Sequence, residues 1–140
     1  MRERTDIVCD RILKNIIRVF PASLDDMKSE RQNRGTVQAR ASAAWLMRNQ
    51  TERTISGQMS FPRIARRLSG PDTSRDHTTI MNNVQQVGNA QRGKLEGRRR
   101  ENMYGPEFRK RLKIVARRSR SQFDGSRMAE PGDVGFEPVL

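Results

Sequence analysis

The chain has 140 residues, of which 28 are Lys or Arg and 16 are Asp or Glu, so its formal net charge at pH 7 is +12. A hydrophobic fraction of 34%, an aromatic fraction of 5% and a single cysteine, Cys9, exclude a large α/β enzyme and a disulfide-stapled scaffold. No apolar run approaches the roughly 18 residues that a membrane span needs. We therefore expect a cytoplasmic protein with no signal peptide and no membrane partner.

The positive charge is unevenly distributed along the chain. Residues 1–90 carry 15 basic and 9 acidic side chains, residues 91–120 carry 12 and 3, and residues 121–140 carry 1 and 4. We expect three parts with these boundaries: a folded domain, a basic helical extension and a flexible acidic tail. Arg outnumbers Lys by 23 to 5, and its planar fork suits phosphates and guanine edges. The charge therefore predicts a polyanionic partner, most often nucleic acid.

Helical spacing of apolar residues dominates the first half of the chain. Residues 5–20 are expected to form an amphipathic helix. Its buried face is expected to consist of Ile7, Ile12, Leu13, Ile16, Ile17 and Phe20. Ser23 can cap a short helical turn over residues 22–27. A polar basic loop follows, with Gly35 as its hinge, and an alanine-rich helix is expected over residues 37–49.

A polar loop is expected over residues 50–59, followed by a short helix. Ser60 is the expected cap of this helix, which begins at Phe61 and has Pro62 in its first turn. Gly70 and the proline after it stop the helix.

Two further helices are expected. The first begins at about Arg75 and Asp76, carries the apolar stripe Ile80, Val84 and Val87, and is weakened by Gly88 and Gly93. The second begins near Pro106, and a flexible tail is expected from about Ser119. Its apolar side is formed by Phe108, Leu112 and Val115. No segment alternates apolar and polar residues as a strand does, so the predicted fold class is all-α.

A short helix, a turn and a second helix form a helix-turn-helix, a unit that reads DNA. The second helix enters the major groove, and its N-terminal residues meet base edges. Here that N-terminus reads Arg-Asp-His-Thr-Thr-Ile over residues 75–80. His77 can donate to guanine or accept from an amino group, while Thr78 and Thr79 can bond bases or phosphates and pack their methyls on thymine.

The run Arg75–Ile80 resembles the signature of the C-terminal DNA-binding domain of the bacterial replication initiator DnaA. Residues 60–65, Ser-Phe-Pro-Arg-Ile-Ala, resemble that family's Ser-Leu-Pro-Glu-Ile-Gly helix start. Residues 39–48 resemble its long central helix, and residues 7–27 resemble its opening helix and turn. The resemblance covers about residues 7–90, with residues 105–118 matching the closing helix.

The resemblance implies roles for particular residues. Base contacts carry over to Asp76, His77 and Thr78, with Arg75 beside them and Thr79 on a base or a phosphate. Backbone contacts carry over to Arg40, Arg48 and Pro62. The family also inserts an arginine of its basic loop into the minor groove; Gln32 stands at that position here, so Arg31 or Arg34 would replace it. About six residues are added before Ser60, and residues 71–74 lengthen the turn, which bears on the preferred DNA sequence.

Alternative interpretations of these residues remain open. Asp76 can act simply as a helix cap, and Trp45 lies on the apolar side of its helix, so we expect it in the core rather than against a base. One histidine and one distant cysteine are too few ligands for a metal. Residues 88–94 fit a phosphate-loop spacing, but Leu95 replaces the required Ser or Thr and no strand precedes it. We expect no enzyme, cofactor or metal.

The sequence predicts a sequence-specific double-stranded DNA-binding protein associated with the nucleoid. The preferred role is transcription regulation, specifically activation of the phage or gene-transfer-agent type, with RNA polymerase or another protein bound through the C-terminal region. An origin binder that controls replication is the first alternative, and a basic RNA-binding or scaffold protein is the second. The basic residues over 98–100 and 109–120 form either a solvated helix face or a contact with a second stretch of phosphates. The oligomeric state stays open.

Overall fold

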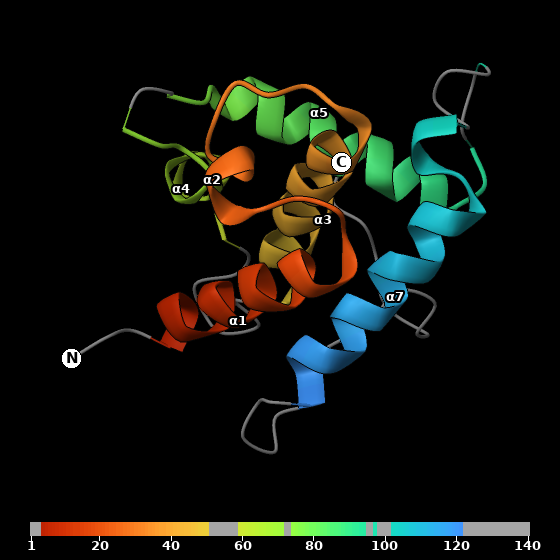
Figure 1. Cartoon of the computed structure of the whole chain (residues 1–140), viewed down its shortest axis with the longest axis horizontal. Helices are drawn as coiled ribbons and strands as arrows, with labels where there is room; N and C mark the ends of the chain where they lie inside the picture. The colour runs from red at the N-terminus through yellow and green to blue at the C-terminus, as the bar shows by residue number, and fades with distance from the viewer. Residues whose placement is uncertain (1–3, 51–58, 72–73, 95–96, 98–101, 122–140) are drawn as a thin grey trace.

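The computed structural model describes residues 4–50, 59–71, 74–94, 97 and 102–121. Its helices are α1 (Arg4–Val19), α2 (Leu24–Met27), α3 (Arg34–Gln50), α4 (Phe61–Arg67), α5 (His77–Gln91) and α7 (Pro106–Ser121). These stretches contain helices and no strand, which confirms the all-α class (Figure 1). No helix among the described residues is long and apolar enough to cross a membrane.

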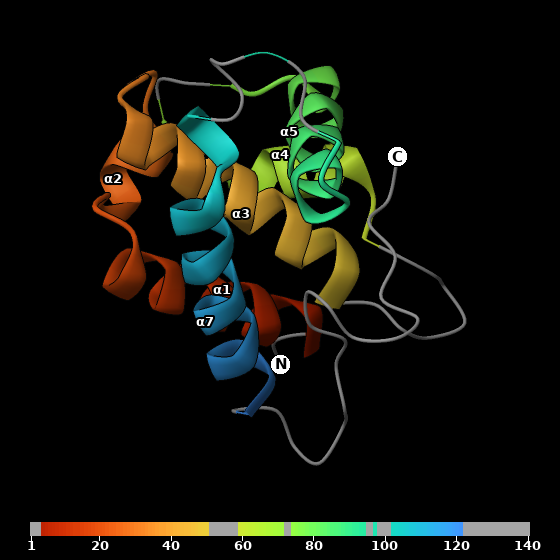
Figure 2. The same ribbon diagram turned by 90° about the vertical axis from the view of Figure 1, so that its right-hand side faces the viewer.

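Helix α3 is the centre of the fold, and α1, α2, α4, α5 and α7 all pack against it (Figures 1 and 2). The helix begins at Arg34, three residues earlier than expected, because the Asn33 side chain accepts a hydrogen bond from the Thr36 amide at 2.9 Å and so caps it. Since other helices surround it, small alanines allow close approach, and Trp45 is fully buried as expected.

The buried face of α1 differs from the expected one at both ends. Ile12, Ile16 and Phe20 are buried as predicted, but Ile7 and Ile17 are each 40% exposed. Each lies five positions from Ile12, about 140° away around a helix of 3.6 residues per turn. Val8 and Cys9, which the sequence reading omitted from the face, are buried in the core.

Short-range capping and one close approach shape the chain between α1 and α3. Ser23 accepts a hydrogen bond from the Asp26 amide at 3.0 Å, so the expected cap of α2 is present. Gly35 is not a hinge, because it lies inside α3. A Cβ atom there would lie 2.7 Å from the carbonyl oxygen of Pro21, so this position needs glycine for close packing.

Helix α7 packs against α1 and α3 and completes the core. Phe108, Leu112 and Val115 are buried as predicted and belong to the same core as α1 and α3. The helix extends to Ser121, so the expected start of a flexible tail at Ser119 is wrong: Ser119 is buried and its hydroxyl accepts a hydrogen bond from Asn15 at 3.3 Å. Of the acidic tail expected over residues 121–140, residues 122–140 lie outside the described residues, as do residues 51–58 of the expected loop.

Candidate nucleic-acid interface

Helices α4 and α5 pack together against α3 and form the helix-turn-helix. Ser60 caps α4 by accepting a hydrogen bond from the Arg63 amide at 3.3 Å, and Pro62 lies exposed in the first turn, both as predicted. On α5 the expected stripe of Ile80, Val84 and Val87 is fully buried. This burial fixes the rotation of α5 and turns its N-terminal polar residues outwards.

The start of α5 is an exposed polar tip formed by residues 76–79. Asp76 caps the helix by accepting a hydrogen bond from the Thr78 amide at 3.0 Å, and its other close neighbour is Nδ1 of His77 at 3.3 Å from Oδ1. The Thr78 amide holds the pKa of Asp76 below its usual value, so the cap is charged at neutral pH. His77, Thr78 and Thr79 are all exposed. The tip can therefore present donors, acceptors and methyl groups to a ligand.

Arg75, expected as a base contact, instead points into the protein. Its Nε donates to the carbonyl oxygen of Leu68 at 2.7 Å, and one terminal nitrogen donates to the carbonyl oxygens of Met27, at 2.9 Å, and Ser29. Its amide donates to the hydroxyl of Ser69 at 3.0 Å. The residue immediately before the helix cap is thus tied both to the end of α4 and to the chain after α2.

Arg40, expected as a phosphate contact, is only 4% exposed and does not reach the surface. Its guanidinium donates to the carbonyl oxygens of Met27 at 2.9 Å, Asp26 at 2.9 Å and Ser29 at 2.6 Å. The carbonyl groups of Asp26 and Met27 lie at the C-terminal end of α2, where cations are favoured, and that of Ser29 follows two residues after the helix. We call the arrangement of Arg40 and Arg75 around these carbonyls the arginine clamp.

The clamp holds two positive charges close together. Burial, and then the neighbouring charge of Arg75, lower the pKa of Arg40 to about 10. Burial likewise lowers the pKa of Arg75, and Glu30 counteracts part of this effect. Both guanidinium groups stay charged at neutral pH. Their buried N–H donors therefore need acceptors, which the carbonyl oxygens provide. Close packing completes the site, since a Cβ atom on Gly70 would collide with the carbonyl oxygen of Lys28.

Arg48 lies beside the start of α4 and is half-buried. One terminal nitrogen donates to the carbonyl oxygen of Met59 at 2.7 Å, and its guanidinium carbon lies 4.3 Å from the ring centroid of Phe61. Burial lowers the pKa of Arg48. The stacked geometry fixes a guanidinium next to the cap of α4, the end of the helix that favours anions.

The two candidate minor-groove arginines lie at either end of the segment that leads into α3. Arg31 is exposed and pairs with Asp26 at 3.1 Å, which is the main reason that the pKa of Asp26 is lowered. Arg34 is exposed at the first position of α3 and donates to the carbonyl oxygen of Asn102. Both are therefore accessible, but Arg34 is held towards the chain that precedes α7.

The comparison with protein families agrees with this geometry. The model described as the bacterial dnaA protein helix-turn-helix matches residues 9–87, more than half of the chain. The chain belongs to this family. It is therefore a DNA-binding helix-turn-helix protein, and the family is not a catalytic one.

A curated relative of this family is the chromosomal replication initiator protein DnaA of Gloeothece citriformis (strain PCC 7424). The two are 29% identical over 94 residues, which are 67% of this chain and 18% of the relative. The chain thus spans less than a fifth of the length of the initiator that it matches. No solved structure matches the chain.

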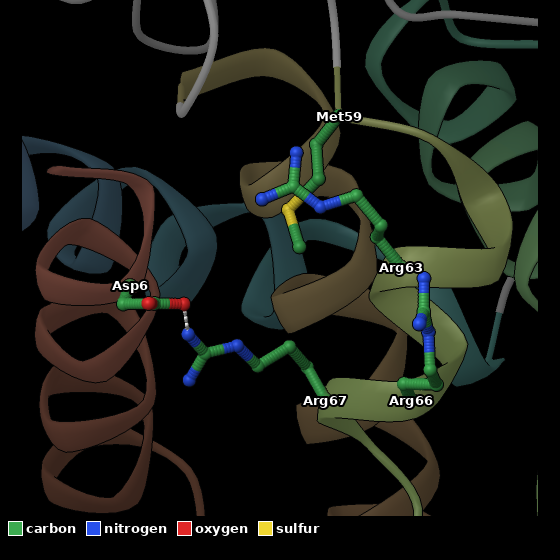
Figure 3. Close-up of a pocket in the computed structure, with 5 residues that line it drawn as sticks. All are labelled: Asp6, Met59, Arg63, Arg66 and Arg67. Atoms are coloured by element: carbon green, nitrogen blue, oxygen red, sulfur yellow. Dashed lines mark ion pairs between the residues drawn. The ribbon is translucent and has the colours of Figure 1, made fainter. Parts of the chain in front are cut away.

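Three arginines of α4 line a hollow that the sequence analysis did not predict. Arg63, Arg66 and Arg67 line an open hollow of about 290 Å³ together with Asp6 and Met59 (Figure 3). Arg67 pairs with Asp6 and, at 3.4 Å, with Asp10 of α1. Their spacing of i, i+3 and i+4 would have indicated a shared helix face. The DnaA family's helix start has Glu where this chain has Arg63, so the hollow is more basic than that resemblance implies.

No group of three or more His, Cys, Asp or Glu side chains gathers in the described part of the chain in a way that could hold a metal ion. Cys9 is buried, and its sulfur lies 3.7 Å from that of Met59.

Proposed function

We propose that the protein binds double-stranded DNA in a sequence-specific manner and regulates transcription. The observation that carries this proposal is the exposed polar tip of α5, at the N-terminus of the second helix of the helix-turn-helix. In this unit the tip enters the major groove. The buried stripe on the same helix supports the proposal because it leaves the tip as the outward-facing part of α5.

The tip carries the base contacts in this proposal. His77, with a side chain that is 58% exposed, reads a guanine or adenine edge, and Thr78 and Thr79 read a neighbouring base or phosphate. Asp76 caps α5 and, with a side chain that is 66% exposed, also accepts a hydrogen bond from an amino group of a base. One carboxylate therefore shapes the helix start and takes part in recognition.

The arginine clamp positions the tip and does not itself touch bases. Arg75, the residue before the cap, donates to the carbonyl oxygens of Met27 and Ser29. Arg40 of α3 donates to the same two oxygens. Because the segment after α2 and the start of α5 share these contacts, they keep a fixed relative position. A site built on such supports reads bases more precisely than a loose loop does.

Other residues are proposed to contact the DNA outside the base edges. Arg48 and Pro62 lie with the exposed start of α4 and are proposed to meet phosphates, while Arg31 or Arg34 enters the minor groove. Narrow minor grooves attract arginine because their potential is strongly negative. The combination of groove and phosphate contacts gives a salt-dependent affinity with a sequence-dependent part.

The proposed cellular role is that of a transcription activator of the phage or gene-transfer-agent type, located on the nucleoid, with RNA polymerase as the protein partner. Control of replication is the second candidate, favoured by the replication initiator among the relatives. Mapping the occupied sites in cells separates the roles: promoter occupancy supports the first and origin occupancy the second.

Selection from a random duplex library with the purified full chain tests the proposed binding. The wild type should enrich one motif. His77→Ala should relax preference at one or two positions, at about 1–3 kcal/mol on the selected site. Gln85→Ala, an exposed substitution further along the same helix, is the matched control and should keep the motif. Equal preference in wild type and His77→Ala would refute the assignment of the tip.

A further inference from the structure

Helix α7 carries an unusual excess of positive charge. Its 16 residues include one acidic side chain, Glu107. Its basic residues are Arg109, Lys110, Arg111, Lys113, Arg117, Arg118 and Arg120. The family match covers residues 9–87 and so ends before α7.

Three of these basic residues form an exposed line, which we call the α7 stripe: Lys110, Lys113 and Arg117. They stand at i, i+3 and i+7, the spacing of one helix face, and at 1.5 Å per residue they extend over about 10 Å. The opposite face is held in the core by Phe108, Leu112, Val115 and Ala116. Packing therefore fixes the stripe outward.

Along α7, basic side chains far outnumber the one acidic side chain, Glu107. Lys113 and Arg117 are like charges at i, i+4, and Lys110 and Lys113 are like charges at i, i+3; such pairs destabilise a helix. Glu107, which stands three residues before Lys110, pairs with Arg111 at 3.5 Å. A polyanion laid along the stripe would reduce the repulsion between Lys110 and Lys113.

The stripe lies away from the DNA-reading tip. Helix α7 begins beside the far end of α5, where Arg109 donates to the carbonyl oxygen of Ala90 at 3.4 Å, and then runs across α1 and α3 (Figures 1 and 2). His77 is at the other end of the 15-residue helix α5, about 20 Å away along its axis. A contact at the stripe is therefore separate from the contacts that the tip makes with bases.

We propose that the α7 stripe binds the phosphate backbone of a second segment of duplex DNA, so that one protein molecule bridges two segments. The inference rests on the proposed function, because the tip holds the first segment. The regular negative charge of a duplex complements a linear array of cations. On a long DNA molecule, a segment held on the tip also raises the local concentration of the rest of that molecule near α7. The contact is independent of sequence because it involves phosphates only.

A bead assay with the full chain tests the bridge. A duplex with the selected site is fixed to beads, protein is added, and retention of a labelled duplex of unrelated sequence is measured at several salt concentrations. The wild type should retain the labelled duplex. Lys110→Glu with Lys113→Glu should abolish retention, and removal of these two phosphate contacts should reduce the salt slope by about 2. Its affinity for a single short site should change far less.

The matched control is Lys14→Glu with Arg18→Glu, which makes the same charge change at exposed positions of α1. Circular dichroism first checks that both double variants keep the helical signal of the wild type. Retention by the control but not by the α7 variant supports the proposal. Equal retention by both, equal loss by both, or no retention by the wild type overturns it.

Failure of the proposed function gives a different result. In that case the library selection yields no motif, whereas retention between two unrelated duplexes still depends on Lys110 and Lys113. A labelled RNA of equal length, retained where the second duplex is not, would overturn the duplex assignment and leave the motif selection intact.

Discussion

Arg40 and Arg75 donate to the same carbonyl oxygens, those of Met27 and Ser29. One arginine comes from the central helix and the other from the residue before the cap of α5. The shared acceptors explain how two positive charges can lie together below the surface, because each is satisfied by backbone oxygens. The clamp thereby couples the segment after α2 to the DNA-reading tip.

Replacing Arg75 by Lys should loosen the tip without removing a phosphate contact. Lysine cannot reproduce the forked contacts with Leu68 and Met27, so we expect a loss of about 1–3 kcal/mol in unfolding free energy and a weaker motif. The salt slope of binding should stay unchanged. Arg66→Lys, at an exposed position of α4, is the control. Retention of both the full motif and the wild-type unfolding free energy would instead show that the contacts of Arg75 do not hold the tip in place.

Arg48→Ala should weaken binding to every duplex and lower the salt slope by about 1, because it removes a fixed cation at the start of α4. Fluorescence anisotropy titrations at a series of salt concentrations measure both effects. Lys94→Ala, exposed beyond the far end of α5, should change neither. An unaltered slope in Arg48→Ala would remove its phosphate role.

Gly70→Ala should destabilise the fold by about 1–3 kcal/mol, since the added Cβ would meet the backbone carbonyl of Lys28, which cannot swing away as a side chain can. Ser74→Ala, exposed in the same connection, should be close to neutral. Urea unfolding of both variants gives the comparison. Equal unfolding midpoints would mean that Gly70 does not pack closely against the backbone of Lys28.

Asp76 should make the stability of α5 sensitive to acid. The Thr78 amide lowers the pKa of Asp76 from its ordinary value of 3.8, so the stabilisation is complete above that value and is lost as the pH falls through the lower folded-state pKa. Asp76→Asn keeps a cap but cannot titrate. The difference in Tm between wild type and this variant should shrink from pH 6 to pH 2. A constant difference over this range would contradict the charged cap.

Local signals predicted much of the fold. Ser60, Pro62 and Asp76 begin their helices as expected, because caps and first-turn prolines act through bonds to the nearest residues. Trp45 was also predicted correctly, since its position on the apolar side of a helix decides its burial.

The clamp could not be predicted in the same way. The sequence shows that Arg40 and Arg75 are cationic, but only the tertiary approach of α2 shows that their partners are carbonyl oxygens instead of phosphates. The prediction of a hinge at Gly35 failed for a related reason, because Pro21, which packs against Gly35, lies 14 positions earlier in the chain. Long-range contacts, rather than helix propensity, decided these roles.

The structure of the full chain bound to its selected duplex tests the central claim most directly. The account predicts His77 and Thr78 in the major groove, within hydrogen-bond distance of base edges, with Arg75 still bonded to Met27. A complex in which these two tip residues face solvent, or contact phosphates alone, would contradict it.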